Sequence, residues 1–381
     1  MFKRLTYLLY AVIFVFMAIS ARATAAQDIT MMTRNLYLGA DLAPVLTAQT
    51  PEEFLAAAQA ALAQVAANNF PERAQTLAAE IVEKRPQIVS LQEVYNFTIN
   101  GQNGPPPFRN YLDDLMAALA SQGADYKVAA VVRDSDISVN LGSGFQLGVT
   151  DRDVILARGD VAFSIVPLAT SGFCRPSMDG CNYPLVFTAQ AVTPLGTITL
   201  ERGFVAVDAL LGGTLVRFVN THLELPAREL DPTNPLPILS IFQFGQAATL
   251  ISILDAFPNP QGAKIVVAGD INSTPVDQIL YVGPPYNITI VPPYMQFALA
   301  GYTDAWTLRP GNPPGFTCCQ AENLLNLDSI LSDRRDVTFF REMPHGMVKA
   351  NLVGNEETDK TPSGLWPSDH AGVVTRMQFS P

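Results

Sequence analysis

Polar residues that can bind a metal ion or a phosphate stand at the ends of several apolar runs in this sequence. Four β-like runs end in them: ITMMTRN at Asn35, QIVSLQE at Glu93, VRFVNTH at Asn220 and His222, and KIVVAGDIN at Asp270 and Asn272. Two further runs begin with them, VTFF after Asp336 and AGVVTRMQF after Asp369 and His370. The end of one antiparallel strand lies beside the start of its neighbour. We therefore expect the six segments to meet at one rim of a pair of sheets.

Carboxylates that are brought together on one rim repel each other and need a cation. Two unit charges 4 Å apart interact by about 1 kcal/mol in water and about 4 kcal/mol at an effective dielectric of 20. Carboxylate and amide oxygens select a hard ion, and we expect Mg²⁺, with Mn²⁺ or Ca²⁺ as alternatives. Such an ion beside two imidazoles suits phosphoester hydrolysis, because the ion neutralises phosphate charge while a base activates water.

The spacing of these residues indicates which side chains can share a site. Asp270 and Asn272 are two residues apart, so both can face the same side of an extended chain. The same spacing separates Asn220 from His222. Asp369 and His370 are adjacent and would point to opposite sides, so Asp369 is a poor candidate for orienting His370. We interpret the third histidine, His345, as an ordinary loop residue.

The elements between these segments indicate a mixed α/β fold. Thr50-Pro51-Glu52-Glu53 is a capping box that opens a helix over 51–68. Hydrophobic periodicity predicts three more helices, from about Pro71 to Arg85, over 108–122 and over 244–257. The apolar stretches 230–243 and 282–297 are predicted to be loops that cover the core, with contact to a substrate or a membrane as the alternative.

The N-terminal residues predict export. Lys3 and Arg4 precede an apolar run over 5–19, and small residues with Ala-x-Ala patterns follow over 20–26. This layout is typical of a secretory signal peptide, with an uncleaved anchor as the alternative. We therefore expect a signal peptide over 1–26, a single domain over 27–381, and a secreted or periplasmic protein.

The net charge of the chain bears on which substrates it can bind. The formal net charge is −11, with 24 Lys and Arg against 35 Asp and Glu. This charge argues against broad non-specific binding of nucleic acid, although a metal site could still accept nucleic acid as a substrate.

The four cysteines suggest disulfide bonds. Cys174 and Cys181 enclose a turn-rich loop suited to a local disulfide, whereas the adjacent Cys318 and Cys319 are either bridged or reduced.

Taken in order, six short motifs resemble the endonuclease/exonuclease/phosphatase superfamily of metal-dependent hydrolases. They are TRN (33–35), LQE (91–93), NTHLE (220–224), GDIN (269–272), RRD (334–336) and SDH (368–370). The resemblance spans residues 29–379 and implies a four-layer α/β sandwich, with two mixed sheets face to face and helices outside. The family includes deoxyribonucleases, apurinic-site endonucleases, neutral sphingomyelinases and inositol-polyphosphate phosphatases.

The resemblance also implies a role for each matching residue. Glu93 and Asn35 would hold the divalent metal ion, with Asp369 near it. Asp270 would position or deprotonate the attacking water. The phosphate would be bound by Asn272 and His222, and His370 would be a second essential imidazole oriented by Asp336. Hydrolysis would then proceed by in-line attack of water without a covalent intermediate.

One motif departs from the family pattern, which has an apolar residue between the arginine and the aspartate. Here that residue is Arg335, and Asp328 in LDSIL is a competing candidate for orienting His370. We favour Asp336, because the strand-like VTFF follows it directly.

The sequence therefore predicts an exported, metal-dependent phosphodiesterase. A phospholipid or another small phosphodiester is slightly preferred as the substrate. The alternatives are a secreted endonuclease that acts on DNA or RNA, and a catalytically silent binding protein on the same fold. We expect a monomer, and the apolar stretches leave a peripheral membrane contact open.

Overall fold

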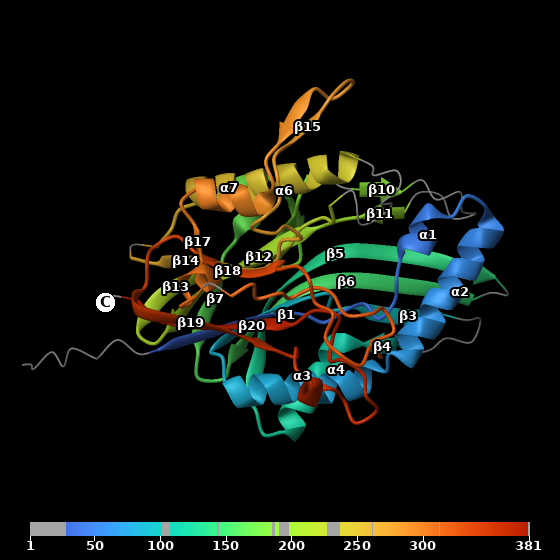
Figure 1. Ribbon diagram of the computed structural model, residues 1–381, viewed down its shortest axis with the longest axis horizontal. Helices are drawn as coiled ribbons and strands as arrows, with labels where there is room; N and C mark the ends of the chain where they lie inside the picture. Colours follow the sequence, from blue (N-terminus) through green and yellow to red (C-terminus); the bar gives the residue numbers. More distant parts are fainter. Residues whose placement is uncertain are drawn as a thin grey trace, which may run out of the picture.

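The computed structural model describes residues 28–100, 107–142, 145–184, 187–189, 198–226, 237–260, 262–311 and 313–379. The predicted signal peptide and part of the predicted loop 230–243 lie outside these ranges. Within them, two large sheets carry helices on their outer faces (Figure 1).

The first sheet joins the two ends of the described chain. Its strand order is β19-β20-β1-β2-β6-β3-β4, and β5 pairs with β6. Strands β1 and β2 are parallel and the other pairs are antiparallel. The bounds are β1 Ile29–Asn35, β2 Ile88–Gln92, β3 Asn96–Asn100, β4 Pro107–Asn110, β5 Tyr126–Gly142, β6 Phe145–Arg158, β19 His345–Val353 and β20 Gly372–Gln378.

The second sheet has the order β17-β18-β14-β13-β12-β9-β8, and β7 pairs with β12. Strands β13 and β14 are parallel, whereas their neighbours are antiparallel. The bounds are β7 Ala162–Ile165, β8 Arg175–Ser177, β9 Gly180–Asn182, β12 Gly203–Leu211, β13 Thr214–His222, β14 Lys264–Asp270, β17 Thr303–Asp304 and β18 Asp336–Phe340. Both sheets are therefore mixed, as the sequence predicts.

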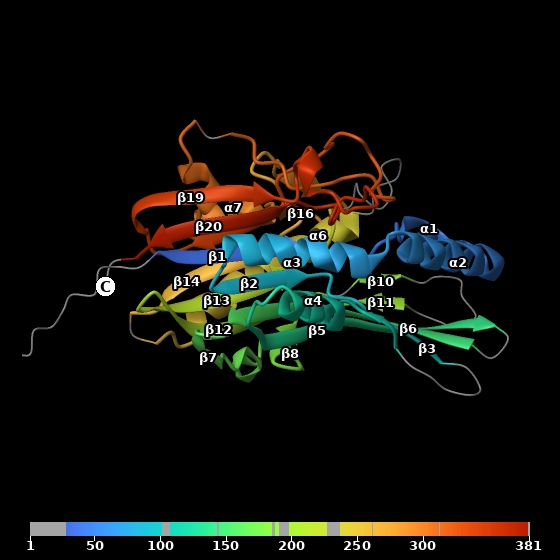
Figure 2. The same cartoon turned by 90° about the horizontal axis from the view of Figure 1, so that it is seen from below.

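Helices cover the outer face of each sheet (Figure 2). Helices α2 (Pro51–Ala67), α3 (Phe70–Lys84) and α4 (Tyr111–Ser121) pack on the first sheet, and α6 (Pro237–Ala256) and α7 (Pro293–Leu299) pack on the second. Successive side chains of β2 alternate between layers, since Val89 contacts the helices and Ile88 faces the other sheet. The predicted four-layer sandwich is confirmed.

The sequence patterns predicted the start of α2 correctly but not the start of α6. Thr50 caps α2 as predicted, because its Oγ1 accepts a hydrogen bond from the Glu53 backbone N–H at 3.1 Å. Helix α6 begins at Pro237, seven residues before the predicted start, so the end of the predicted loop 230–243 is helical. Its sequence is apolar on all sides, which hides the helical period. By length and composition α6 could cross a membrane, but Ala247, Leu250 and Ile253 pack against the second sheet.

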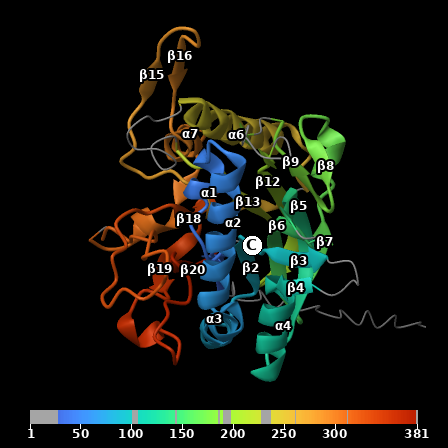
Figure 3. The same cartoon turned by 90° about the vertical axis from the view of Figure 1, so that its right-hand side faces the viewer.

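The predicted loop 282–297 is also partly regular. It contains the end of β15 (Leu280–Val282), then β16 (Ile288–Ile290), and most of α7. The β15–β16 hairpin projects beyond α6 and α7 (Figure 3). Large apolar side chains are exposed on this hairpin, among them Leu280, Tyr281 and Tyr286.

Both cysteine pairs are bridged. The predicted local disulfide joins Cys174 to Cys181. Cys318 and Cys319 are placed as a vicinal disulfide, which is the bridged one of the two alternatives.

Candidate active site

Strand register brings the predicted rim together. Asn35 at the end of β1 pairs with Gln92, and Glu93 follows directly. In the second sheet His222 is level with Asp270, and Asp270 lies directly opposite Asp336 at the start of β18. The prediction that strand ends and strand starts share one rim is therefore confirmed for these residues.

The chain turns sharply where the strands end. Glu93 has a φ of 57° and Asn272 a φ of 49°, which is the left-handed region that asparagine tolerates better than glutamate. Gly269 allows β13 and β14 to approach closely, because a Cβ there would lie 2.0 Å from the Thr221 carbonyl oxygen. These backbone features aim Glu93 and Asn272 into the space beyond the strand ends.

That space is a cavity of about 420 Å³. Six of the predicted site residues line it, namely Glu93, His222, Asp270, Asn272, Asp369 and His370. The other two, Asn35 and Asp336, are buried directly behind them. All eight predicted residues therefore lie in one place.

His370 is paired with a buried carboxylate. Its Nδ1 lies 2.7 Å from Oδ2 of Asp336, which is 1 % exposed. Burial opposes the charged imidazolium, but the negative charges of Asp336, Asp369 and Asp270 overcome this and raise the pKa of His370 to about 10. The competing Asp328 is exposed and makes no such contact. The geometry therefore favours Asp336 as the partner of His370.

His222 lies in the opposite electrostatic environment. Nη1 of Arg202 is 2.9 Å from its Nδ1, and Nδ2 of Asn272 is 3.1 Å from its Nε2. Both neighbours are donors, so a protonated ring would face N–H groups on both sides. Burial, and next the charge of Arg202, hold the pKa of His222 well below its usual value. One imidazole is therefore neutral while the other is charged.

Asp270 lies between the two imidazoles. Its Oδ2 is 3.6 Å from Nε2 of His222 and 3.7 Å from Nε2 of His370. Burial alone would raise the pKa of Asp270, but the charge of His370 and the hydrogen bond from the Asn272 backbone N–H hold it below its usual value. Because both distances exceed that of a hydrogen bond, a water molecule or phosphate oxygen could approach all three groups.

Glu93 is held by two donors. Its Oε1 accepts from Nδ2 of Asn35 at 3.0 Å, and its Oε2 accepts from the Leu38 backbone N–H at 2.6 Å. The same Asn35 nitrogen donates to Oδ2 of Asp270 at 3.2 Å, while its Oδ1 accepts from the Tyr37 backbone N–H at 2.9 Å. Asn35 therefore presents its nitrogen to the carboxylates, and it orients Glu93 and Asp270.

The donors at the cavity fit a hard divalent cation. Glu93, Asp270 and Asp369 all line it, and carboxylate oxygens are the ligands that Mg²⁺ and Ca²⁺ prefer. Burial raises the pKa of Asp369 to about 6. The charge of His370 opposes this rise, and the negative charges of Glu93 and Asp270 add to it. A bound cation would offset this repulsion. Ligand atoms of Asp270, Asp336 and His370 also lie within 4.8 Å of one another, but the hydrogen bond between His370 and Asp336 accounts for that group.

The expectation for the two adjacent residues Asp369 and His370 is only half right. Asp369 does not orient His370, as expected. Both side chains nevertheless line the same cavity, because the chain bends at 369–370 instead of continuing as a strand. Arg34 holds this bend by donating to the His370 carbonyl oxygen while it forms a buried ion pair with Glu80 at 3.0 Å.

The sequence reasoning missed Arg202. It lies within 4 Å of two buried carboxylates, Asp151 and Glu224, at 3.8 Å each. Asp134 and Asp153 lie deeper, and neither carboxylate has a hydrogen-bond partner among the described residues. Arg202 stands just before β12, which is the same strand-start position that drew attention to Asp336. Extending that rule to ERGF would have found it.

The structure also separates the ambiguous residues from the site. Asn220 is buried between the sheets, and its Oδ1 accepts from Oγ of Ser90 at 2.7 Å. Arg152, which stands near the start of the run DVILAR, donates to the Val94 carbonyl oxygen at 3.0 Å. His345 is the exposed first residue of β19, not a loop residue.

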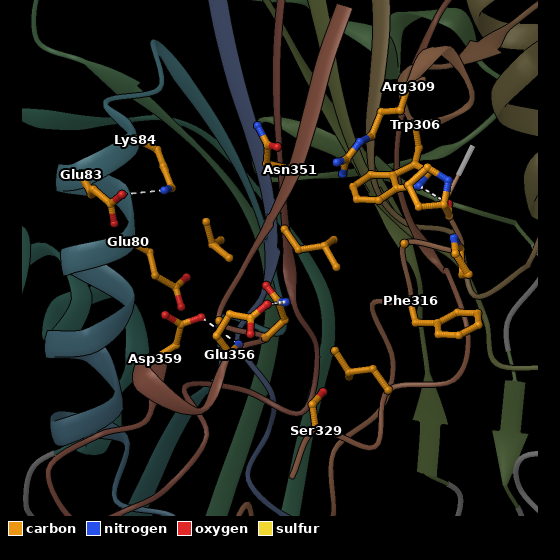
Figure 4. Close-up of a pocket in the computed structure, with 18 residues that line it drawn as sticks. Glu80, Glu83, Lys84, Trp306, Arg309, Phe316, Ser329, Asn351, Glu356 and Asp359 are labelled. Atoms are coloured by element: carbon orange, nitrogen blue, oxygen red, sulfur yellow. Dashed lines mark hydrogen bonds and ion pairs between the residues drawn. The ribbon is translucent and has the colours of Figure 1, made fainter. Parts of the chain in front are cut away.

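A larger groove of about 800 Å³ is lined by a different set of residues (Figure 4). Glu80, Glu83 and Asp359 stand on one side of it, and Trp306 and Phe316 on the other. None of the predicted site residues lines this groove. The chemistry therefore belongs to the smaller cavity at the strand ends.

Comparisons with known proteins concern solved structures. No protein-family model matches the chain, and no curated protein matches it by sequence. It is similar to an endonuclease/exonuclease/phosphatase family protein from Leptotrichia buccalis, with 16 % identity, a TM-score of 0.48, and 92 % of this chain and 100 % of that chain covered.

Two further structures are similar to the chain. One is an endonuclease/exonuclease/phosphatase from Beutenbergia cavernae, with 19 % identity, a TM-score of 0.49, and 93 % and 72 % coverage of this chain and that chain. The other is D. rerio TDP2 complexed with single-strand DNA product, with 16 % identity, a TM-score of 0.46, and 92 % and 99 % coverage.

Proposed function

We propose that this protein is a divalent-metal-dependent phosphodiesterase. The observation that carries the proposal is the position of Asp270, whose Oδ2 lies 3.6 and 3.7 Å from the Nε2 atoms of His222 and His370. Glu93 and Asp369 line the same cavity. A base, two imidazoles and a hard-cation site in one cavity are the groups that phosphoester hydrolysis needs.

Each side chain has a distinct task in this proposal. Glu93 and Asp369 would hold the divalent ion, which when bound neutralises charge on the phosphate. Asp270 is ionised, so its Oδ2 accepts a proton from the attacking water. His370 is charged and donates from Nε2 to a phosphate oxygen, while Asp336 fixes its ring through Nδ1. His222 and the side-chain amide of Asn272 bind a second phosphate oxygen, and the water attacks in line without a covalent intermediate.

A small phosphodiester suits the cavity better than a polynucleotide. Among the described lining residues, eight are carboxylic acids and only two are arginines. A polyanionic backbone running along such a wall would be repelled at every phosphate beyond the reacting one. We therefore infer a small or lipid-derived phosphodiester as the substrate, with DNA or RNA as the alternative to be tested.

A peripheral membrane contact is part of the proposal. The stretch 278–299, which contains the projecting hairpin, has no charged residue. Ile279 and Tyr281 are 54 % and 65 % exposed on it. Exposed apolar residues gathered on one projection are typical of an interaction site. Binding of the protein to phosphatidylcholine vesicles, compared with an Ile279→Ser/Tyr281→Ser variant, tests this contact, and equal binding of both proteins would contradict it.

We further propose that the protein is exported. The signal-peptide pattern of residues 1–26 and the Cys174–Cys181 disulfide support a secreted or periplasmic location. Expression of the full chain should place a shortened protein outside the cytoplasm. Retention of full-length protein in the cytoplasm would contradict the proposal.

A substrate panel tests the activity. Bis-p-nitrophenyl phosphate, sphingomyelin, phosphoinositides, plasmid DNA and RNA would be assayed with Mg²⁺, Mn²⁺ and Ca²⁺. His370→Ala and Asp270→Asn should reduce turnover by about 10²–10⁴-fold, while the matched controls His345→Ala and Asp328→Asn should retain it. Full activity of either site variant would refute its role. Absence of metal-stimulated activity on every substrate would instead favour a catalytically silent binding protein.

A further inference from the structure

We propose that an apolar pocket beside the catalytic cavity binds the alkyl tail of the phosphodiester substrate. This inference rests on the phosphodiesterase activity proposed above and names its substrate class. The pocket has a volume of about 80 Å³. Sixteen described side chains line it, and every one of them is aliphatic or phenylalanine. A site of this composition selects a hydrocarbon group.

The pocket adjoins the catalytic cavity. Six side chains larger than alanine line both, namely Leu38, Leu42, Leu46, Ile137, Val149 and Leu200. Leu38 marks the boundary, because its backbone N–H donates to Oε2 of Glu93 while its side chain lines the pocket. A substrate whose phosphate lies at Asp270 therefore has an apolar path that leads away from the carboxylates.

Helices α1 (Ala43–Thr47) and α2 and the long strands β5 and β6 supply most of the side chains that line the pocket. The course of these four elements can be followed in Figure 2. Strand β5 has 17 residues and β6 has 14. Leu46, Ile137 and Val149 are only partly buried although they face other apolar side chains. Side chains that border a void lack dispersion contacts on that side, and an alkyl chain would supply them.

A chain-length series tests the pocket without changing the leaving group. The methyl, butyl, hexyl and octyl esters of p-nitrophenyl phosphate would be assayed with Mg²⁺ below their micelle concentrations. Each methylene that becomes buried should raise kcat/KM by about fourfold, until the pocket is full and the values level off. Equal kcat/KM for all esters would overturn the tail pocket and leave the phosphodiesterase in place. Hydrolysis of none of them would overturn both proposals.

Two variants on consecutive residues of α2 provide a matched comparison. Ala61 lines the pocket, whereas Ala60 is exposed on the same helix. Ala61→Phe should fill the pocket and abolish the gain for the octyl ester while leaving the methyl ester unchanged. Ala60→Phe should keep the chain-length dependence of the natural protein. A retained octyl preference in Ala61→Phe would overturn the inference.

A second substitution covers the case in which Ala61→Phe does not fold. Leu46 is a partly buried residue of the short helix α1. Leu46→Ser places a hydroxyl in the pocket with little change in the core, and thermal unfolding would confirm that it folds. It should reduce the ratio of octyl to methyl kcat/KM several-fold. An unchanged ratio would count against the pocket in the same way.

Discussion

Arg202 lies against the ring of His222, with Nη1 2.9 Å from Nδ1. The other imidazole has a carboxylate at the corresponding atom, because Oδ2 of Asp336 is 2.7 Å from Nδ1 of His370. The two histidines on either side of Asp270 are therefore tuned in opposite directions. This difference supports separate tasks in the proposed phosphodiesterase, in which the neutral ring would position the phosphate and the charged ring would stabilise its developing negative charge.

Removal of Arg202 should raise the pKa of His222. In Arg202→Met the positive charge beside the ring is gone, so protonation becomes less unfavourable. NMR titration of the histidine side chains should show His222 protonating well below the usual pH of a histidine in the natural protein and at a higher pH in the variant. Arg152→Met is the control, because Arg152 donates to the Val94 carbonyl outside the cavity. Identical His222 titrations in natural and Arg202→Met protein would contradict the assignment.

Replacement of Asp336 should disable His370 without unfolding the chain. Asp336→Asn keeps the shape but removes the charge that sustains the imidazolium, so we expect kcat to fall by about 10²–10⁴-fold. The pKa of His370, raised to about 10 in the natural protein, should fall toward its ordinary value. Steady-state kinetics and histidine NMR would measure both effects. Asp328→Asn should change neither, and a large loss of activity there would reverse the choice between the two aspartates.

Glu93 should govern metal affinity. Its two oxygens are held by Asn35 and the Leu38 backbone, so the carboxylate is preorganised for an ion. Glu93→Gln should weaken Mn²⁺ binding about 10- to 100-fold, as seen when groups around metal sites are altered, and titration calorimetry would record the change. Glu322→Gln is the matched control, since Glu322 is an exposed carboxylate on the same cavity. If both variants weakened Mn²⁺ binding equally, the loss would come from the changed net charge of the cavity, and Glu93 would not be a specific ligand of the ion.

The buried aspartates behind Arg202 should make stability depend on pH. Burial, and next the charge of Asp134, raise the pKa of Asp153 well above its usual value. The folded state therefore keeps a proton that the unfolded chain releases near pH 4. The stability from this proton is complete below that pH and is lost as the pH rises through the folded pKa.

Asp153→Asn should remove this loss of stability with rising pH, because an amide side chain stays neutral at every pH. The stability of the variant relative to the natural protein should therefore increase between pH 5 and 8, by at most about 1.4 kcal/mol per pH unit. Urea unfolding at each pH would measure the difference. Asp328→Asn, at an exposed position, should show no such trend. A constant difference for Asp153→Asn across this range would mean that Asp153 is ionised in the folded protein.

The fold and most of the site could be predicted from the sequence, because strand ends are local features. Apolar runs that end at Asn35, Glu93 and Asp270 are visible without knowing which strands pair. The role of Asn220 was not visible, since its spacing from His222 is correct for a shared face. Only the packing of the two sheets shows that Asn220 is buried between them and does not line the cavity. There its Oδ1 accepts hydrogen bonds from Ser90 and Gln92 at 2.7 and 2.8 Å.

Arg202 escaped prediction, and Asp369 was predicted as a site residue but with the wrong side-chain direction, for different physical reasons. The contact of Arg202 with His222 depends on the antiparallel pairing of β12 with β13, in which Phe204 lies opposite Thr221. Such pairing is long-range information, so the strand-start position of Arg202 marks it as a candidate but does not show that it reaches His222. Asp369 reaches the cavity because the chain bends there, and the anchor of that bend is Arg34, more than three hundred residues earlier. Side-chain direction inferred from an extended strand therefore fails at this position.

The most direct test of the account is to titrate the metal-free protein with Mn²⁺ and record ion binding and bis-p-nitrophenyl phosphate hydrolysis on the same sample. Turnover should be absent in chelator, rise in proportion to the bound ion, and return after chelation and reloading. Asp270→Asn should bind the ion yet remain inactive. Full turnover in chelator, or a folded protein that binds no ion, would contradict the account.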